Sequence, residues 1–281
     1  MRPERLGVIG LGAIGGSVAW GAAKAGISRI IAHTLEPKDG AAAVRAGAVT
    51  ELANSAARVV RAAELLVLAA PPGETLRLLE SLAPLVRKRS VICTDVSSVK
   101  RPAVDLAVRL GLAGHFAGSH PFAGTEETGF QAARPDRFQG RVVYVTAPEG
   151  GGDAAREIAD FWERVFDAHP VAIAAEQHDR LLAWISHLPQ AVASALANTL
   201  SRSSPEGASP GTGALDTTRL AASSVEMWTD ILHMNKDAVL AALDRFDDSV
   251  AELRSVVERG DQRALADWLA VGADWRRRYR S

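Results

Sequence analysis

The sequence of 281 residues has almost no cysteine, since Cys93 is the only one. One cysteine cannot form an internal disulfide, which is typical of proteins that work in a reducing compartment. Cys93 lies in the largely apolar run Ser90–Thr94, so we interpret it as a small core residue rather than a nucleophile. We therefore expect a soluble, cytoplasmic protein.

An excess of charge of either sign is also absent. Lys and Arg number 32 and Asp and Glu number 33, which gives a formal net charge of −1. A nearly neutral chain has no general electrostatic attraction to nucleic acid or to an anionic membrane. The one basic cluster, Arg276–Arg280, is typical of a solvated helix end, where cations suit the helix dipole. We expect no nucleic-acid partner and no metal site.

Apolar runs that could cross a membrane are missing as well. Residues 6–23 and 181–201 lack Asp, Glu, Lys and Arg. The first stretch is interrupted repeatedly by glycine, and the second contains serine, histidine, proline and glutamine. The second is therefore too polar for a membrane span and is typical of a buried helix. We expect no membrane partner.

What the sequence does contain is an ordinary globular composition, with 47% hydrophobic and 23% charged residues. Short β-like runs alternate with Ala-rich helical stretches in the first half, which predicts a parallel α/β sheet. The predicted strands are residues 6–9, 29–33, 65–69, 91–95 and 140–146. Residues 176–199 predict one long helix that Pro189 can kink. We expect an α/β domain over residues 1–172 and an all-α domain over residues 173–281.

A glycine-rich turn, Gly10-Leu11-Gly12-Ala13-Ile14-Gly15, follows the first predicted strand and opens a helix. Gly10 permits the tight turn, Gly12 lets the backbone approach a pyrophosphate, and Gly15 lets helix and strand pack closely. The helix N-terminus then offers N–H groups and a positive dipole end to the phosphates. In this context the pattern predicts a dinucleotide site, and a glycine turn without function is the alternative.

The second predicted strand ends without the acid that binds the ribose hydroxyls of NAD. Thr34 occupies that position and would not repel a 2′-phosphate, with which Lys38 can pair. Glu36 can instead serve as the ribose acid, so the cofactor is left open between NAD and NADP. A turn such as Ala69–Pro72, which contains Ala70 and Pro71, commonly passes under the cofactor, although a plain strand terminator explains the two prolines equally well.

Three clusters carry candidate reactive groups. The segment Asp95–Lys100 lies at the carboxyl end of a predicted strand, where parallel sheets bind ligands, and its serines can also cap the next helix. His120 lies on what the sequence predicts to be a constrained loop, a suitable place for a general base. Arg219 can bind a carboxylate through a bidentate pair, or form an ion pair with Asp216 or Glu226.

A helical pattern near the C-terminus repeats apolar residues at spacings of four and three. Such a seam packs along another helix. It consists of Val239, Leu243, Phe246, Val250, Leu253 and Val257. Packing within the chain and packing across a dimer interface explain it equally well.

Together these motifs resemble the prephenate/arogenate dehydrogenases of tyrosine biosynthesis, over essentially the whole chain and in the same order. The most specific motifs are Ser119–Glu126 and Ser186–Pro189. The glycine turn, Asp95–Lys100, and Thr218–Ile231 followed by Asn235 add to them. The resemblance implies an α/β Rossmann-type N-terminal domain with an all-α C-terminal dimerisation domain, and a homodimer formed through that helical domain.

The resemblance also implies an oxidative decarboxylation, in which hydride passes from the ring carbon bearing the 4-hydroxyl to the nicotinamide and the ring carboxylate leaves as carbon dioxide. His120 would take the hydroxyl proton, and Ser98 would hydrogen-bond to His120 and to that hydroxyl. Arg219 would bind a substrate carboxylate, and Glu126 would pair with Arg219 at the pocket mouth. Further substrate contacts are expected from Thr125, His187 and Gln190. Cofactor contacts are expected from Gly10, Leu11, Gly12, Ala13, Ile14, Gly15, Thr34, Ala70, Pro71 and Asp95, and the resemblance favours NAD over NADP.

One departure from the family concerns the substrate. Where the family often has a second histidine after Ser-His-Leu-Pro, this chain has Gln190, which carries no positive charge and would contact a carboxylate more weakly. Prephenate is the expected substrate, with arogenate or 4-amino-4-deoxyprephenate as alternatives. Another two-domain 3-hydroxyacid or imine dehydrogenase is a second hypothesis. A redox-sensing module that binds a dinucleotide is a third, against which the presence of Ser98, His120 and Arg219 argues.

Overall fold

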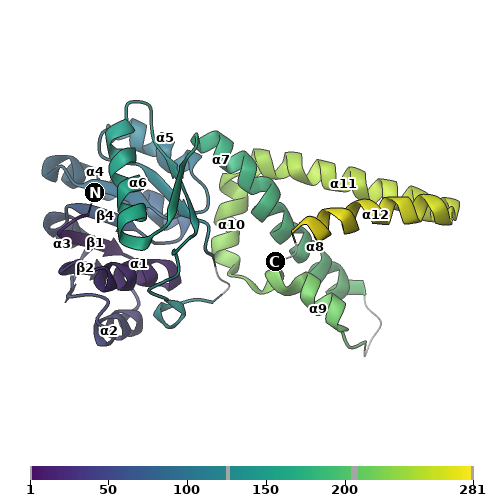
Figure 1. Ribbon diagram of the computed structural model, residues 1–281, viewed down its shortest axis with the longest axis horizontal. Helices are drawn as coiled ribbons and strands as arrows, with labels where there is room; N and C mark the ends of the chain where they lie inside the picture. Colours follow the sequence, from purple (N-terminus) through teal and green to yellow (C-terminus); the bar gives the residue numbers. More distant parts are fainter. Residues whose placement is uncertain (1, 125–126, 204–207, 280–281) are drawn as a thin grey trace. The chain divides into compact units, whose positions relative to one another are not determined.

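The computed structural model describes residues 2–124, 127–203 and 208–279. Contacts divide the chain into two compact units, Met1–Asn235 and Lys236–Ser281. The first unit holds both sheets and helices α1 to α10, and the second holds helices α11 and α12 (Figure 1). The domain boundary expected after residue 172 lies where β8 (His169–Ala172), the last strand of the described residues, ends.

The larger sheet has five parallel strands in the order β3-β2-β1-β4-β5. Their bounds are β1 (Arg5–Ile9), β2 (Arg29–His33), β3 (Glu51–Leu52), β4 (Leu65–Leu68) and β5 (Ile92–Asp95). In the register of the sheet, Leu6 of β1 lies between Ile30 and Leu65. The predicted parallel α/β sheet is confirmed. The sequence missed β3, a two-residue strand held by its pairing with β2.

Helices cover this sheet on both faces (Figure 1). They include α1 (Ala13–Lys24), α2 (Pro37–Arg45), α3 (Ala56–Ala62), α4 (Pro72–Arg89), α5 (Arg101–Arg109) and α6 (Gly152–Phe166). Because successive strand residues point to opposite faces, Val8 and Ile9 belong to two separate apolar cores. Cys93 lies in the second core with no exposed surface, and burial raises the pKa of its thiol. Its interpretation as a core residue is confirmed.

A second sheet of three strands holds β6 (Gly118–Pro121), β7 (Val142–Thr146) and β8. β6 runs antiparallel to β7, and β8 runs parallel to it. The expectation that His120 lies on a loop is therefore wrong, because His120 is a strand residue paired with Tyr144. The sequence Gly-Ser-His-Pro has little strand preference of its own, so pairing with β7 decides its conformation.

The remainder of the first unit is helical. It comprises α7 (Ala175–Leu182), a π-helical segment (Ala183–His187), α8 (Leu188–Ser203), α9 (Thr212–Thr218), a 3₁₀ turn (Arg219–Ala222) and α10 (Val225–Met234). The long helix predicted over 176–199 is present, and its irregularity falls just before Pro189. Proline has no N–H, so the carbonyl of Ile185 lacks its usual α-helical donor, and the wider π geometry accommodates the change.

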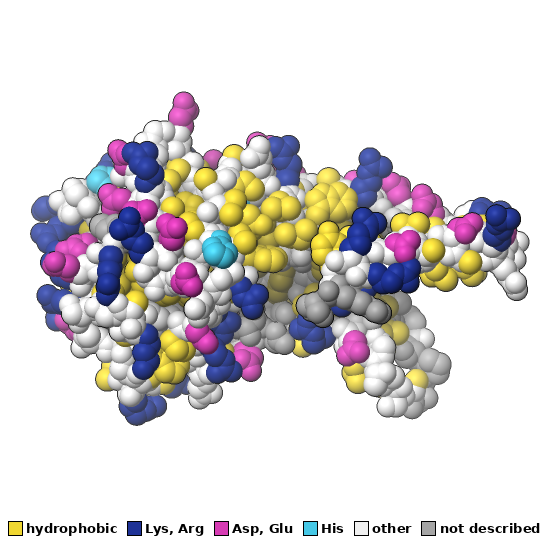
Figure 2. All heavy atoms as spheres, viewed as in Figure 1, with side chains coloured by type: hydrophobic (Ala, Val, Ile, Leu, Met, Phe, Trp, Pro, Cys, Tyr) yellow, Lys and Arg dark blue, Asp and Glu magenta, His cyan; other side chains and the backbone are white. Residues whose placement is uncertain are grey.

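The second unit is a hairpin of α11 (Lys236–Arg259) and α12 (Gln262–Arg278). Asp261 caps α12 by accepting hydrogen bonds from the N–H groups of Arg263 and Ala264, each at 3.0 Å. Apolar side chains stay exposed along the hairpin (Figure 2). They include Leu240, Val250, Val257, Leu269, Val271 and Trp275. Over the described residues, every helix is too short or too polar to span a membrane.

Candidate active site

The glycine turn between β1 and α1 is tight at its two ends and open in its middle. Gly10 has a φ of +93°, and a Cβ there would collide with the carbonyl of Ala69. A Cβ on Gly15 would collide with the carbonyl of Gly10, whereas a Cβ on Gly12 would meet nothing within 4 Å. Helix α1 also has no acidic residue in its first turn. These features suit the close approach of a pyrophosphate at the helix N-terminus.

The other predicted cofactor residues lie at the same edge of the sheet, where β1, β2 and β4 end. The backbone N–H of Gly10 donates to the carbonyl of His33 at 2.8 Å, which joins the glycine turn to the end of β2. Next along the chain, Thr34 Oγ1 accepts a hydrogen bond from the N–H of Glu36 at 3.2 Å. After β4, Thr75 Oγ1 donates to the carbonyl of Ala70 at 2.9 Å, immediately before Pro71.

Asp95 and Lys100 form a fully buried ion pair, with Lys100 Nζ 2.6 Å from Asp95 Oδ2. Lys100 Nζ also donates to the carbonyl of Ser119 at 2.7 Å, so the pair connects the end of β5 to β6. Burial lowers the pKa of Lys100, and the charge of Asp95 opposes that effect. Oδ2 of Asp95 is thus engaged within the protein, whereas Oδ1 is buried and has no hydrogen-bond partner among the described residues.

His120 is the first member of a buried hydrogen-bond relay. Its Nδ1 lies 2.9 Å from Nε2 of His178, and His178 Nδ1 lies 2.7 Å from Oδ1 of Asp179. His178 and Asp179 are neighbours on α7, and sequence reasoning missed both. In the part of the chain that the structure describes, His178 and not Ser98 is the partner of His120. Burial, followed by the charges of His178, Lys100 and His187, holds the pKa of His120 well below its ordinary value of 6.5.

A buried amide connects this relay to His187. Asn235 Nδ2 lies 2.8 Å from the Asp179 carbonyl, to which it donates, and 3.0 Å from His187 Nδ1. Burial lowers the pKa of His187 to about 4, so its ring is neutral at neutral pH. Because Nδ1 accepts from an amide, the proton of the neutral ring is on Nε2. Nε2 is buried and has no hydrogen-bond partner among the residues described.

Gln190 lies one helical turn further on. Its Nε2 donates to the carbonyl of Leu220 at 2.9 Å and to Ser194 Oγ at 3.3 Å. The Leu220 carbonyl can accept a hydrogen bond only from the amide nitrogen of Gln190, so the atom that faces it is Nε2 and the other amide atom is the oxygen. That oxygen, Oε1, is buried and unpartnered within the described ranges. The contact also brings Gln190 to the 3₁₀ turn that begins with the exposed Arg219.

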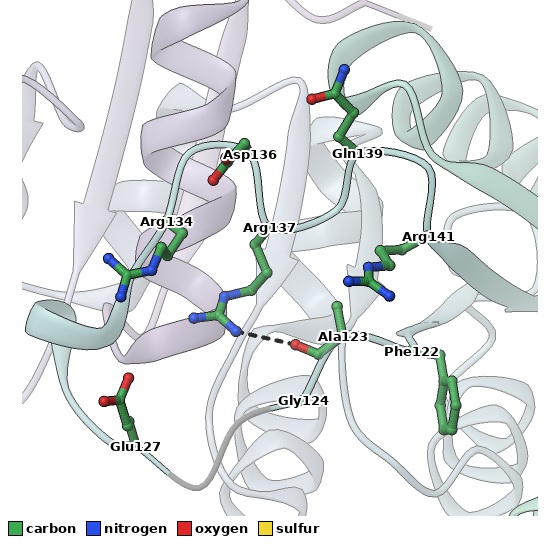
Figure 3. Close-up of a pocket in the computed structure, with 9 residues that line it drawn as sticks. All are labelled: Phe122, Ala123, Gly124, Glu127, Arg134, Asp136, Arg137, Gln139 and Arg141. Atoms are coloured by element: carbon green, nitrogen blue, oxygen red, sulfur yellow. Dashed lines mark hydrogen bonds between the residues drawn. The ribbon is translucent and has the colours of Figure 1, made fainter. Parts of the chain in front are cut away.

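Two predicted substrate residues, Thr125 and Glu126, lie outside the described residues. The flanking segments border a cavity of about 940 Å³ whose lining includes Arg134, Arg137 and Arg141 (Figure 3). Arg137 Nη1 donates to the carbonyl of Ala123 at 3.2 Å. Phe122 connects this cavity to the relay, because its ring packs edge-on against His120 with a centroid separation of 6.1 Å.

A glycine turn shaped for a pyrophosphate and a buried neutral histidine together define the class of this protein: a dinucleotide-dependent oxidoreductase with an α/β domain followed by helices. The family model described as "Prephenate dehydrogenase, nucleotide-binding domain" matches residues 22–170. The model described as "Prephenate dehydrogenase, dimerization domain" matches residues 174–271. The chain therefore belongs to the prephenate dehydrogenase family. Its fold class and its use of NAD(P) are as the sequence predicted.

Individual relatives agree with this assignment. The prephenate dehydrogenase of Bacillus subtilis (strain 168) is 34% identical over 278 residues, which cover 95% of this chain and 74% of the relative. A prephenate dehydrogenase from Aquifex aeolicus, solved in complex with hydroxyphenyl propionate and NAD⁺, superposes with a TM-score of 0.91 at 28% identity and covers 98% of both chains. Synechocystis arogenate dehydrogenase superposes with a TM-score of 0.79 at 26% identity, covering 98% of this chain and all of that one.

Proposed function

We propose that this chain catalyses the NAD(P)-dependent oxidative decarboxylation of prephenate to 4-hydroxyphenylpyruvate. The observation that carries the proposal is His120, a buried histidine held neutral next to the edge where the cofactor turn lies. A neutral imidazole can accept a proton at neutral pH, as this reaction requires of a base. Family membership favours this reaction over that of a 3-hydroxyacid or imine dehydrogenase.

In the proposed reaction, His120 accepts the proton of the 4-hydroxyl while hydride leaves the same carbon. The ring carboxylate then departs as carbon dioxide and leaves its bonding electron pair in the ring, which becomes aromatic. His120 returns its proton to the phenolate oxygen, so no net proton is released from the hydroxyl. Bound NAD(P)⁺ supplies the hydride acceptor, and the protein mainly orients the reacting groups.

The remaining roles follow the family motifs. Ser98, half-buried after β5, hydrogen-bonds to the hydroxyl and approaches His120 from the side of Nε2, because Nδ1 is taken by His178. Arg219 binds a substrate carboxylate. Glu126 pairs with Arg219 at the pocket mouth, and Thr125 contacts the substrate.

Two sets of residues complete the site. The cofactor lies over Gly10–Gly15, with Thr34, Ala70 and Pro71 beside it and NAD as the preferred dinucleotide. His187 and Gln190 contact the side chain of the substrate. In support, each has a buried polar atom without a partner among the described residues: Nε2 of His187 and Oε1 of Gln190.

We also propose that the functional boundary lies at residue 172 and that the helical part forms a homodimer in the cytoplasm. Exposed apolar residues along α11 and α12, which include members of the predicted seam, support a partner surface. Leu269→Glu would place a charge on that surface. Analytical ultracentrifugation should then show a dimer for the parent and a shift to monomer for the variant, whereas a monomeric parent would contradict the proposal.

Arogenate is the second candidate substrate, and Gln190 favours it. The buried Oε1 is an acceptor without a positive charge, which suits the ammonium group of an amino acid better than the keto group of prephenate. The same oxygen does not discriminate against 4-amino-4-deoxyprephenate, which differs at the ring rather than at the side chain.

The test is a matrix of prephenate, arogenate and 4-amino-4-deoxyprephenate, each with NAD⁺ or NADP⁺, following reduced cofactor by absorbance. Turnover in at least one combination is expected, and turnover with arogenate alone would replace the first candidate by the second. His120→Asn should lower kcat by about 100-fold or more while dinucleotide binding persists. Absence of turnover in every combination, together with intact dinucleotide binding, would reject the proposed reaction.

A further inference from the structure

We propose that His178 and Asp179 are positioning residues that fix the tautomer of His120, so that its Nδ1 carries the proton and its Nε2 is the basic atom facing the reaction. This inference rests on the proposed function for its catalytic meaning, but the tautomer itself can be measured independently. Neither residue belongs to the motifs that identify the family in this sequence.

Asp179 accepts hydrogen bonds at both of its carboxylate oxygens. Its Oδ1 accepts the backbone N–H of Lys100 at 2.8 Å, and its Oδ2 accepts the backbone N–H of Arg101 at 2.9 Å. These N–H groups belong to the first turn of α5, where the helix dipole favours a negative charge. The carboxylate of Asp179 is almost fully buried and is fixed at both oxygens.

The side chain of His178 has no exposed surface. Its Nδ1 faces the Asp179 carboxylate at 2.7 Å, and an ionised carboxylate can only accept. His178 Nδ1 therefore carries a proton. Burial lowers the pKa of His178, so the ring is neutral and has only this one proton. His178 Nε2 is consequently an acceptor.

The protonation of His178 in turn fixes that of His120. Its Nδ1 lies 2.9 Å from the accepting Nε2 of His178, so Nδ1 must be the donor. A neutral His120 has no second proton, which leaves Nε2 with a free lone pair. The opposite arrangement, with His120 Nδ1 accepting, would require the unprotonated Nδ1 of His178 to face a carboxylate, and two acceptors 2.7 Å apart repel each other.

The surroundings keep this arrangement in place. The charged and titratable groups around the relay are Asp95 and Lys100 from the β5–α5 connection, His187 from the π-helical segment, Tyr144 from β7 and Asp179 itself. The rings of Tyr144 and His178 meet edge-on, with centroids 5.5 Å apart, which restricts rotation of the His178 ring. Asn235 fixes the backbone of Asp179 through its carbonyl.

The first experiment compares two variants at each position. His178→Leu removes the acceptor, whereas His178→Gln retains an amide oxygen that can accept from His120 Nδ1. We expect His178→Leu to lower kcat by about 100-fold or more, as expected when a general base loses its orientation, with a much smaller change in KM. His178→Gln should stay within about tenfold of the parent. His169→Gln, an exposed histidine of β8, is the matched control and should leave kcat unchanged.

The same contrast applies to the carboxylate. Asp179→Asn keeps an oxygen that can accept from both Lys100 and His178, although its amide nitrogen then faces the N–H of Arg101, so it should lose less activity than Asp179→Ala. Asp179→Ala removes that acceptor and frees the His178 ring. Its kcat should therefore fall to about the same value as that of His178→Leu. The double variant His178→Leu/Asp179→Ala should be no slower than either single variant, because both act through His120.

The second experiment reads the tautomer directly. Two-bond ¹H–¹⁵N spectra distinguish protonated from unprotonated ring nitrogens in the full chain labelled with ¹⁵N-histidine. The signals of His120 are assigned as those that are missing from the spectrum of His120→Asn. We expect His120 of the parent to carry its proton on Nδ1, and His178→Leu to lose that single pattern. A parent His120 protonated on Nε2 would overturn the inference, as would an unchanged kcat in His178→Leu. If no combination of substrate and cofactor shows turnover, or if the variants fail to fold, the spectrum of the parent protein alone still decides the tautomer of His120.

Discussion

Asp230 Oδ2 accepts a hydrogen bond from the backbone N–H of Gly73 at 2.8 Å, although 157 residues separate them in the chain. Gly73 lies in the first turn of α4, directly after the Ala70–Pro71 turn, and Asp230 lies on α10. A carboxylate from the helical region thus satisfies an unpaired N–H of a helix in the α/β region. It does so at the sheet edge proposed for the cofactor.

We expect Asp230→Ala to lower the free energy of unfolding by about 1 kcal/mol, the usual cost of losing a helix cap. Asp230→Asn keeps an acceptor oxygen and should lose less. Urea unfolding followed by circular dichroism measures both, with the exposed Asp267→Ala as control. Equal stability of Asp230→Ala and the parent would show that water replaces the carboxylate without cost.

The glycine turn predicts opposite behaviour for two similar substitutions. Gly12→Ala introduces a methyl into open space, so the protein should fold with nearly parental stability but bind NAD(P) at least tenfold more weakly, because the methyl occupies the approach of the pyrophosphate. Gly15→Ala forces a methyl against the Gly10 carbonyl and should be destabilised even without cofactor. Thermal unfolding and titration of each dinucleotide separate the two effects. Tight NAD(P) binding by Gly12→Ala would place the pyrophosphate elsewhere.

Gln190 predicts a change of substrate preference. In Gln190→His, a cationic or donating ring replaces the amide whose Oε1 is unpartnered in the described structure. The ratio of kcat/KM for prephenate to that for arogenate should rise about tenfold, because a histidine can donate to a keto acid but repels an ammonium group when protonated. Gln190→Glu should shift the ratio the other way. A ratio that neither variant moves would remove Gln190 from the substrate pocket.

The buried histidines predict a loss of stability in acid. Burial lowers the pKa of His187 from its ordinary value of 6.5 to about 4, so between these pH values the unfolded chain binds a proton that the folded chain does not. Stability is therefore fully present above pH 6.5 and falls toward pH 4, by about 1.4 kcal/mol per pH unit for this group. His178 and His120, whose pKa values are lowered in the same direction, add to the fall.

Urea unfolding at intervals from pH 7.5 to pH 4.5 measures this slope. His187→Asn retains a side chain that can bond with Asn235 but cannot titrate, and its slope should be shallower than that of the parent. Parallel slopes for the two proteins would show that His187 does not remain neutral in the folded state.

The sequence predicted most of the larger sheet because its strands are apolar, bounded by turns and buried on both faces. β6 was missed for the opposite reason: Gly118–Pro121 has no strand-like pattern, and both its pairing with β7 and the hydrogen bond that its Ser119 carbonyl accepts from Lys100 come from other parts of the chain. The glycine turn was predictable because all of its functional geometry is local, within six consecutive residues.

The catalytic relay was only partly predictable. His120 is marked by the small residues and proline around it, but His178 and Asp179 are two ordinary polar residues in a helical stretch. Their role depends on β6, α5 and α7 meeting in space, with His178 58 positions from His120. The sequence marked Asn235 only as part of a family motif. Its hydrogen bonds to Asp179 and His187 could not be predicted, because they depend on how the helices pack in the fold.

The π-helical segment at Ala183–His187 has a consequence for how this chain can change length in evolution. A π turn holds one residue more than an α turn, so deletion of a single residue there would leave a continuous α-helix. The lost residue is the one by which the two kinds of turn differ, so the chain beyond the deletion would keep nearly the same rotation about the helix axis. His178 before the segment and Gln190 after it would both keep their places, and only the wide turn that ends at His187 would change. A deletion of one residue within Ala183–His187 is therefore expected to preserve the flanking helices, whereas a deletion from a regular turn of α8 would rotate the rest of that helix by about 100°.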